Sequence, residues 1–254
     1  TTLTFTGLVG SETLGQTVGS TFDNKNVGSN KTVTVNSITL ADGSGLAANY
    51  SISAGQTTTA NITPKALTVS GITASNKMYD GNTVATLSSS NVTYSGIVSG
   101  DSFAGSFSGS FSDKNIGTGK TVTITSSYSG SDVSNYTVTD QSSTTANITS
   151  RDLEVTGITV FGLTVNNKEY DGTVTAPLKT DNISYSGLVE GDDFTGSYSG
   201  VFANANVGNG KAVTITSTYS GADAGNYTVT DQSTTTGNIV PKVLTATASA
   251  SNKT

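Results

Sequence analysis

The sequence predicts an all-β protein made of tandem small β-sandwich domains, and two observations carry this prediction. Apolar residues alternate with small polar residues, as in residues 120–125 and 153–156, and a period of two is typical of strands with one buried face. No segment shows the sustained spacing of three and four that predicts a long helix. The chain of 254 residues also repeats itself, and the repeat length suits a small β domain.

Three landmarks recur in the same order along the chain. They are a loop that opens with Phe (residues 22–28, 111–117 and 202–208), an Asn-Tyr pair (49–50, 135–136 and 226–227) and a closing Asn-Ile pair (61–62, 147–148 and 238–239). Asn61 and Asn147 are 86 residues apart, and Asn147 and Asn238 are 91 apart. We place the five additional residues around Phe161.

The landmarks divide the chain into four parts. We expect residues 1–63 to be the C-terminal part of an incomplete repeat, 64–149 and 150–240 to be complete repeats, the second with a five-residue insertion, and 241–254 to be the first strand of a further repeat. The similar segments that begin at Lys65, Arg151 and Lys242 mark the joints. Pro64 and Pro241 fix φ there, so we expect short, stiff joints and domains stacked end to end into a rod.

A recurring tyrosine favours an immunoglobulin-like sandwich. Asp223, Gly225 and Tyr227 have the spacing of a tyrosine corner, in which a buried Tyr hydroxyl bonds to backbone upstream. Tyr136 stands at the same place in the preceding repeat. The alternative that stays open is a β-grasp-like repeat.

Composition excludes several classes of function. The chain has no His and no Cys, which removes Ser-His-Asp and Cys-His catalysis and the usual zinc sites. A net charge of −6 argues against nucleic acid, which requires a basic surface. No apolar run approaches 18 residues, so we expect no membrane insertion in this segment. We therefore expect no enzyme and no cofactor.

Several motifs together resemble the bacterial YDG (MBG-type) repeat. They are residues 77–83 and 168–173, which contain Tyr-Asp-Gly, the loop 113–117, the run 221–227 and the joint 62–67. Such repeats are similar to those of large filamentous-haemagglutinin-like and adhesin-like exoproteins, where they form stalks. The resemblance implies an extracellular location on the bacterial cell surface. The chain departs from the pattern at Ser150, which replaces the joint proline.

The Tyr-Asp-Gly motifs have a structural interpretation and a functional one. Asp-Gly favours a turn in which Gly supplies positive φ, and we expect the Tyr to pack on the core; stacking of the ring on a sugar is the alternative. The motif residues are Tyr79, Asp80, Gly81, Tyr170, Asp171 and Gly172.

Recurring loop carboxylates are weak candidates for calcium, which prefers oxygen ligands. They are Asp101, Asp192 and Asp193. The adjacent pair Asp192 and Asp193 does not indicate a glycosidase, because its counterpart in the preceding repeat is Asp101 followed by Ser102.

The sequence therefore predicts a structural stalk that projects a distal binding region. The alternative is that the repeats themselves bind a host-cell receptor, a glycan or another copy in a biofilm. Residues 1–63 lack a counterpart of residues 67–90, so we expect exposed core and an unpaired strand edge there. We expect either that this part is poorly ordered or that another copy supplies the missing strands, the first of which residues 241–254 resemble.

Overall fold

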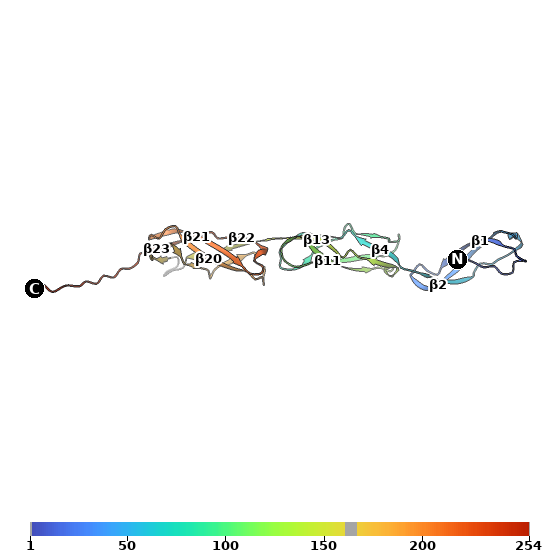
Figure 1. Ribbon diagram of the computed structural model, residues 1–254, viewed down its shortest axis with the longest axis horizontal. Coiled ribbons are helices and arrows are strands. Elements are labelled where there is room, and N and C mark those ends of the chain that lie inside the picture. The colour runs from blue at the N-terminus through green and yellow to red at the C-terminus, as the bar shows by residue number, and fades with distance from the viewer. Residues whose placement is uncertain (1, 161–166, 254) are drawn as a thin grey trace. The chain divides into compact units, whose positions relative to one another are not determined.

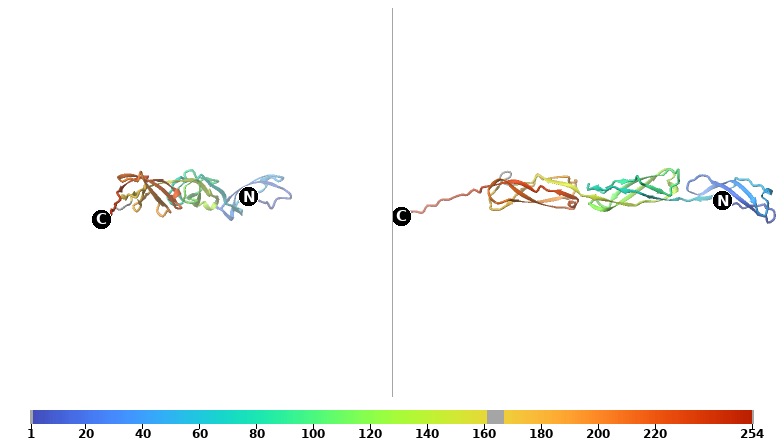
Figure 2. Two further views of the ribbon diagram at one scale, coloured as in Figure 1. Left: turned by 60° about the vertical axis from the view of Figure 1, so that its left-hand side comes forward. Right: turned by 90° about the horizontal axis from the view of Figure 1, so that it is seen from above.

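The computed structural model describes residues 2–160 and 167–253. Within these ranges the regular structure consists of β-strands and three short 3-10 turns, which confirms the predicted all-β class (Figure 1, Figure 2).

No helix in this part of the chain is long and apolar enough to cross a bilayer. The insertion predicted around Phe161 lies outside the described residues.

The elements follow one another in the same order in each part of the chain. Up to residue 62 they are β1 (Leu14–Phe22), β2 (Gly28–Asp42), η1 (Ala47–Asn49) and β3 (Thr57–Ile62). From residue 65 they are β4 (Lys65–Ser70), β5 (Thr73–Ala74), β6 (Lys77–Met78), β7 (Val84–Ala85), β8 (Leu87–Ser88), β9 (Thr93–Ser95), β10 (Ala104–Phe111), β11 (Gly117–Ser129), η2 (Val133–Asn135), β12 (Tyr136–Thr139) and β13 (Ser143–Thr149). From residue 151 they are β14 (Arg151–Thr156), β15 (Thr159–Val160), β16 (Asn167–Glu169), β17 (Thr175–Ala176), β18 (Leu178–Lys179), β19 (Ser184–Ser186), β20 (Thr195–Phe202), β21 (Gly208–Ser220), η3 (Ala224–Asn226), β22 (Tyr227–Thr230) and β23 (Thr234–Val240).

Contacts divide the chain into two units. The first consists of residues 1–72, 88–108 and 124–142, and it contains an antiparallel sheet in the order β1-β2-β3. It also contains a three-stranded sheet in the order β12-β4-β9. The central strand β4 runs parallel to β12 and antiparallel to β9.

The second unit consists of residues 73–87, 109–123 and 143–254. Its sheets include the five-stranded order β16-β23-β21-β20-β17 and the three-stranded order β19-β14-β22. Here β14 is the central strand, parallel to β22 and antiparallel to β19. Parallel pairing also joins β16 to β23, and β6 to β13. These pairings tie the beginning of each complete repeat to its end.

A bulge recurs at the start of each long strand that follows the Phe loop. Asn30, Gly119 and Gly210 have φ of 53°, 61° and 56°, in the left-handed region that Gly adopts readily and Asn tolerates. The backbone N–H of each donates to the Oδ1 of the Asn that closes the repeat, at 2.7–2.8 Å; these are Asn61, Asn147 and Asn238. The recurring Asn is therefore the side chain that fixes the bulge.

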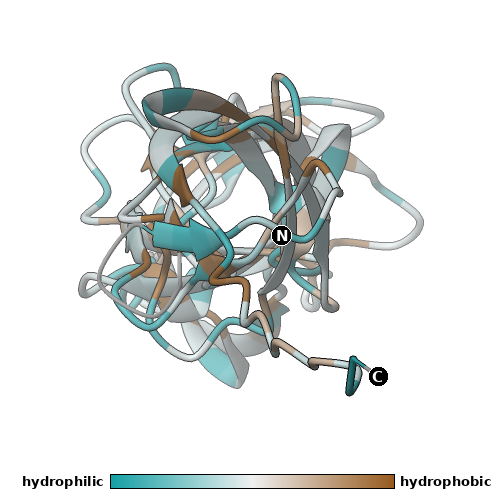
Figure 3. Cartoon of the chain, turned by 90° about the vertical axis from the view of Figure 1, so that its left-hand side faces the viewer, coloured by the Kyte–Doolittle hydropathy of each residue, from teal (hydrophilic) through white to brown (hydrophobic). Residues whose placement is uncertain are grey.

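The buried residues follow the predicted period of two. Leu67 and Val69 in β4 are 1% and 2% exposed, and the Thr between them faces outward. Leu153 and Val155 show the same pattern in β14. Figure 3 shows brown apolar segments alternating with teal and white ones along the ribbons. Burying alternate side chains of short strands supplies the hydrophobic stabilisation of this cysteine-free chain.

Candidate functional site at the repeat joints

The connections between consecutive repeats are very short. Only residues 63 and 64 separate β3 from β4, and Ser150 alone separates β13 from β14. The first joint lies within the first unit and the second joint within the second unit. Loops from both sides of each joint therefore come into contact.

A lysine connects the two sides of the second joint. Nζ of Lys114 lies 2.7 Å from Oδ1 of Asp223 and 3.0 Å from Oδ1 of Asp192. The two carboxylates are 9% and 3% exposed. The hydrogen bonds to Asp223 and Asp192 raise the pKa of Lys114, and the ammonium of Lys114 lowers the pKa of Asp223 despite its burial. Each group therefore stabilises the charged form of its partner.

The first joint repeats this arrangement. Nζ of Lys25 lies 2.6 Å from Oδ1 of Asp101 and 2.7 Å from Oδ1 of Asp132. Hydrogen bonding to Lys25 is the main cause that lowers the pKa of both carboxyl groups. We call each set, a lysine with the two aspartates of the next repeat, a lysine bridge.

An asparagine completes each joint. Oδ1 of Asn226, a residue only 3% exposed, accepts the backbone N–H of Ile116 at 3.0 Å. In the first joint, Oδ1 of Asn135 accepts the backbone N–H of Val27 at 2.9 Å. A side chain of the following repeat thus accepts a hydrogen bond from a backbone N–H of the preceding one.

The recurring tyrosines hold the aspartates of the bridges. Tyr136 and Tyr227 are both 8% exposed. The hydroxyl of Tyr227 accepts the backbone N–H of Val189 at 2.9 Å and donates to Oδ2 of Asp192 at 2.6 Å. Tyr136 makes the corresponding bonds with Val98 and Asp101. Burial, and then the hydrogen bond to Asp192, raise the pKa of Tyr227 to about 12.

The tyrosine prediction is confirmed, because both side chains are buried and each hydroxyl bonds to backbone upstream. The partner of Tyr227 is Val189, which lies 38 residues upstream. The bond to Val189 connects β22 to a loop that is distant in the sequence, and the bond to Asp192 orients that carboxylate. In an immunoglobulin tyrosine corner, by contrast, the hydroxyl bonds to backbone only a few residues upstream.

The Asp-Gly half of each Tyr-Asp-Gly motif forms a turn, as predicted. Oδ1 of Asp80 accepts the backbone N–H of Asn82 at 3.2 Å and pairs with Nζ of Lys77 at 2.7 Å. Gly81 has φ of +79°, and a Cβ there would approach Val189 to 2.8 Å. In the second motif, Asp171 likewise accepts the backbone N–H of Thr173 and pairs with Lys168, and Gly172 has the same φ of +79°.

The two motif tyrosines differ, which corrects the expectation that each packs on the core. Tyr79 is fully buried, and its hydroxyl donates to Oδ2 of Asp192 at 2.8 Å. Its ring packs edge-on against Tyr227, with centroids 5.6 Å apart. Tyr170 is 41% exposed. Tyr79 is buried because residues of the next repeat cover it, so the motif tyrosine is a joint residue.

The calcium candidates lie at the joints. Asp101 and Asp192 each face a lysine ammonium, which occupies the position in which a cation would balance two carboxylates. Asp193 lies beside them, and its Oδ2 accepts the backbone N–H of Ala222 at 2.9 Å. Among residues 2–160 and 167–253, no three acidic side chains gather in a way that could hold a metal ion.

Sequence reasoning did not assign the bridging residues to the joints. Lys25 and Lys114 recur in the Phe loops, and Asn135 and Asn226 recur before the tyrosines. This recurrence was the available signal, but pairing a loop of one repeat with a loop of the next requires tertiary structure. Ala205 stands at the lysine position of the third loop.

Comparison with known proteins identifies a family. The model of the YDG domain matches residues 1–60, 63–146 and 154–236. No curated protein and no solved structure matches the chain. Because the three matched segments cover most of its residues, the chain belongs to the YDG domain family.

Proposed function

We propose that the chain is a non-catalytic spacer segment of a bacterial surface adhesin or secreted exoprotein, and that it holds a distal binding region away from the cell. The observation that carries this proposal is the repetition of one contact set at both joints. Each set contains a lysine bridge, an Asn side chain bonded to backbone across the joint, and a buried Tyr that orients an Asp. Repeated contacts of the same kind at both joints would fix the orientation of each repeat relative to the next. A spacer needs this property in order to hold another domain at a distance.

The proposal includes a finer architecture. Each complete repeat is taken as a small immunoglobulin-like sandwich, with one sheet centred on β4 or β14, and successive sandwiches continue end to end as a rod. The short joints support this arrangement, because a connection of one or two residues leaves little freedom for neighbouring domains. No cofactor enters the proposed function.

Binding of a host glycan by the repeats has less support. A sugar site commonly presents several exposed aromatic rings together. Among the described aromatic side chains, Phe22 and Tyr170 are the most exposed, at 40% and 41%, and they belong to different repeats.

Small-angle scattering on the monomer tests the spacer proposal. Strands of about 8–10 residues at ~3.3 Å per residue, with their end loops, give bodies of roughly 30–40 Å, and three bodies give a rod of about 90–120 Å. Such a rod has a radius of gyration of about 26–35 Å, against ~18 Å for a single compact domain of this length. A value below about 22 Å would show that the repeats pack side by side, and it would remove both the rod and the spacer function.

A further inference from the structure

The first and last segments of the repeat at residues 150–240 run side by side in the same direction. At the start, β14 pairs in parallel with β22, and Arg151 lies opposite Tyr227. At the end, β16 pairs in parallel with β23, and Glu169 lies opposite Val240. Parallel ladders therefore join the N-terminal segment of this repeat to its C-terminal segment at both ends of the path that they share.

A glutamine side chain joins the same two segments between these ladders, after β22 ends and before β23 begins. The backbone N–H of Ile158 donates to Oε1 of Gln232 at 2.9 Å, and Nε2 of Gln232 donates to the Ile158 carbonyl at 2.6 Å. Ile158 is 1% exposed, so both bonds lie in surroundings of low dielectric, where a hydrogen bond is stronger than in water. The side chain thus takes the place of a backbone rung, and we call this pair of bonds a glutamine lock.

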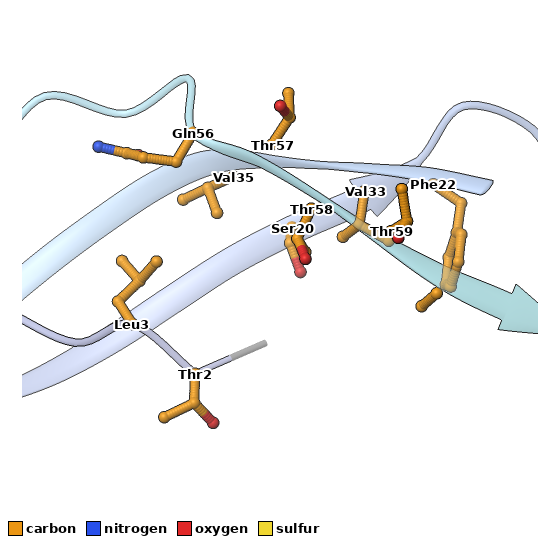
Figure 4. A pocket seen from close by; sticks show the side chains of 11 residues that line it. Thr2, Leu3, Ser20, Phe22, Val33, Val35, Gln56, Thr57, Thr58 and Thr59 are labelled. Carbon is orange, nitrogen blue, oxygen red and sulfur yellow. The ribbon is translucent and has the colours of Figure 1, made fainter. Parts of the chain in front are cut away.

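The first unit contains a second glutamine lock. The backbone N–H of Ile72 donates to Oε1 of Gln141 at 2.9 Å, and Nε2 of Gln141 donates to the Ile72 carbonyl at 2.7 Å. A glutamine does not form this lock wherever it occurs. Gln56, which lines a hollow of about 500 Å³ beside Val33 (Figure 4), donates instead to the nearby carbonyl of Ser53 at 2.7 Å. The two locks are thus specific links between segments that lie 69 and 74 residues apart in the sequence.

Tension along the chain loads the links of residues 150–240 in shear. A force applied at Arg151 and Val240 draws β14 toward its N-terminus and β23 toward its C-terminus. Because the paired segments run in the same direction, these pulls slide them past each other, and the bonds of both ladders and of the lock carry the load together. In the antiparallel hairpin of β20 and β21, a pull at the open end separates Thr195 from Ser220 first, and the other pairs follow one by one. Bonds that must break together present the higher barrier, and the rate of crossing that barrier governs forced unfolding.

We propose that the repeat at residues 150–240 bears tensile force, and that Gln232 locks its two terminal segments together under load. Gln141 has the same role in the preceding repeat. This function goes beyond that of a spacer, because a chain can hold a region at a distance without resisting tension. Small-angle scattering tests the spacer function and force measurements test this one, so the two proposals can fail separately.

Single-molecule force spectroscopy on the full chain tests the proposal, and the lack of native cysteine allows handles to be attached at chosen positions. Ser150→Cys with Lys242→Cys applies the force along the parallel ladders, whereas Thr195→Cys with Ser220→Cys applies it across the open end of the hairpin. We expect the repeat to unfold at a force about twofold or more higher in the first geometry. Equal forces in the two geometries, or a lower force in the first, overturn the proposal.

The ratio of the two forces tests the glutamine lock separately from general stability. Gln232→Met keeps the length of the side chain but removes both bonds to Ile158, and it is expected to lower the ratio. Tyr198→Phe is the matched control, because it removes a hydrogen bond to Tyr185 outside the parallel ladders, and it is expected to leave the ratio unchanged. A ratio that Gln232→Met leaves unchanged, or that both variants lower equally, overturns the role of Gln232. If Gln232→Met does not fold, Gln232→Glu, which loses only the donor, provides the same comparison.

Discussion

Nζ of Lys114 lies 2.7 Å from Oδ1 of Asp223, a residue of the following repeat, and Lys25 stands in the same relation to Asp132. In each case a second aspartate, Asp192 or Asp101, shares the ammonium. The two carboxylates of a bridge repel each other, and the lysine that pairs with both of them favours their charged forms.

Replacing Lys114 is therefore expected to destabilise the second joint. Lys114→Met keeps the apolar stem but leaves the largely buried Asp192 and Asp223 without their cation, and we expect a loss of about 2 kcal/mol in the free energy of unfolding. Urea denaturation measures it. Lys179→Met is the control, because Lys179 makes only a 3.9 Å contact with the exposed Asp181. Equal midpoints for the two variants would show that the bridge contributes nothing.

The bridges give the joints a defined pH dependence. The folded pKa of Asp101, Asp132 and Asp223 lies below the ordinary value, chiefly because of the lysines. The unfolded chain therefore binds more protons in acid, so this stabilisation is present above about pH 4 and is lost as the pH falls through the lowered values. The pKa of Lys25 and of Lys114 is raised in the folded protein, so the stabilisation that these ammonium groups contribute is present at lower pH. It is lost only as the pH rises above about 10.

The measurement is the melting temperature of the parent chain and of Lys114→Met as a function of pH. We expect a constant difference between about pH 5 and pH 9, and a difference that vanishes well below pH 4, when the carboxylates are protonated. A difference that persists in strong acid would mean that Lys114 acts through packing of its stem instead.

The hydroxyl of Tyr227 is expected to contribute separately from its ring. Tyr227→Phe removes the bonds to Val189 and Asp192 and should cost about 1–2 kcal/mol. Tyr227→Ala also removes a buried ring that packs against Tyr79 and Phe194, and it should cost about 3–5 kcal/mol. Tyr170→Phe, at a half-exposed ring, should leave the urea midpoint unchanged. A neutral Tyr227→Ala would contradict a structural role for the joint tyrosine.

The side chain of Asn226 is expected to stabilise the folded protein, because it accepts a hydrogen bond from the backbone of the preceding repeat. Asn226→Ala removes the acceptor of the Ile116 N–H and should cost about 0.5–1.5 kcal/mol. Hydrogen exchange at Ile116 should rise in the variant while exchange at Val122, within β11, stays slow. Unchanged exchange at Ile116 would show that water or another group accepts the hydrogen bond equally well in the variant, and it would contradict this role of Asn226.

The sequence alone determined the local structure of this protein. Alternation of apolar residues predicted the strands, because each strand buries one face regardless of its partner, and Asp-Gly predicted the turns at Asp80 and Asp171 through local backbone preferences. The recurring Asn and Tyr predicted where a repeat ends. These features depend on a few neighbouring residues, so they can be recognised without knowing the fold.

The tertiary structure alone decided what those residues do across a joint. The sequence made Asp101 and Asp192 calcium candidates, and the structure places a lysine of the preceding repeat beside each. It predicted that Tyr79 packs on the core, and the structure shows that Asp192 and Tyr227 of the following repeat cover it. The reason is that a charge or a hydroxyl acts on whatever lies within about 3 Å of it, and the repeat pattern cannot specify which loops of different repeats come that close.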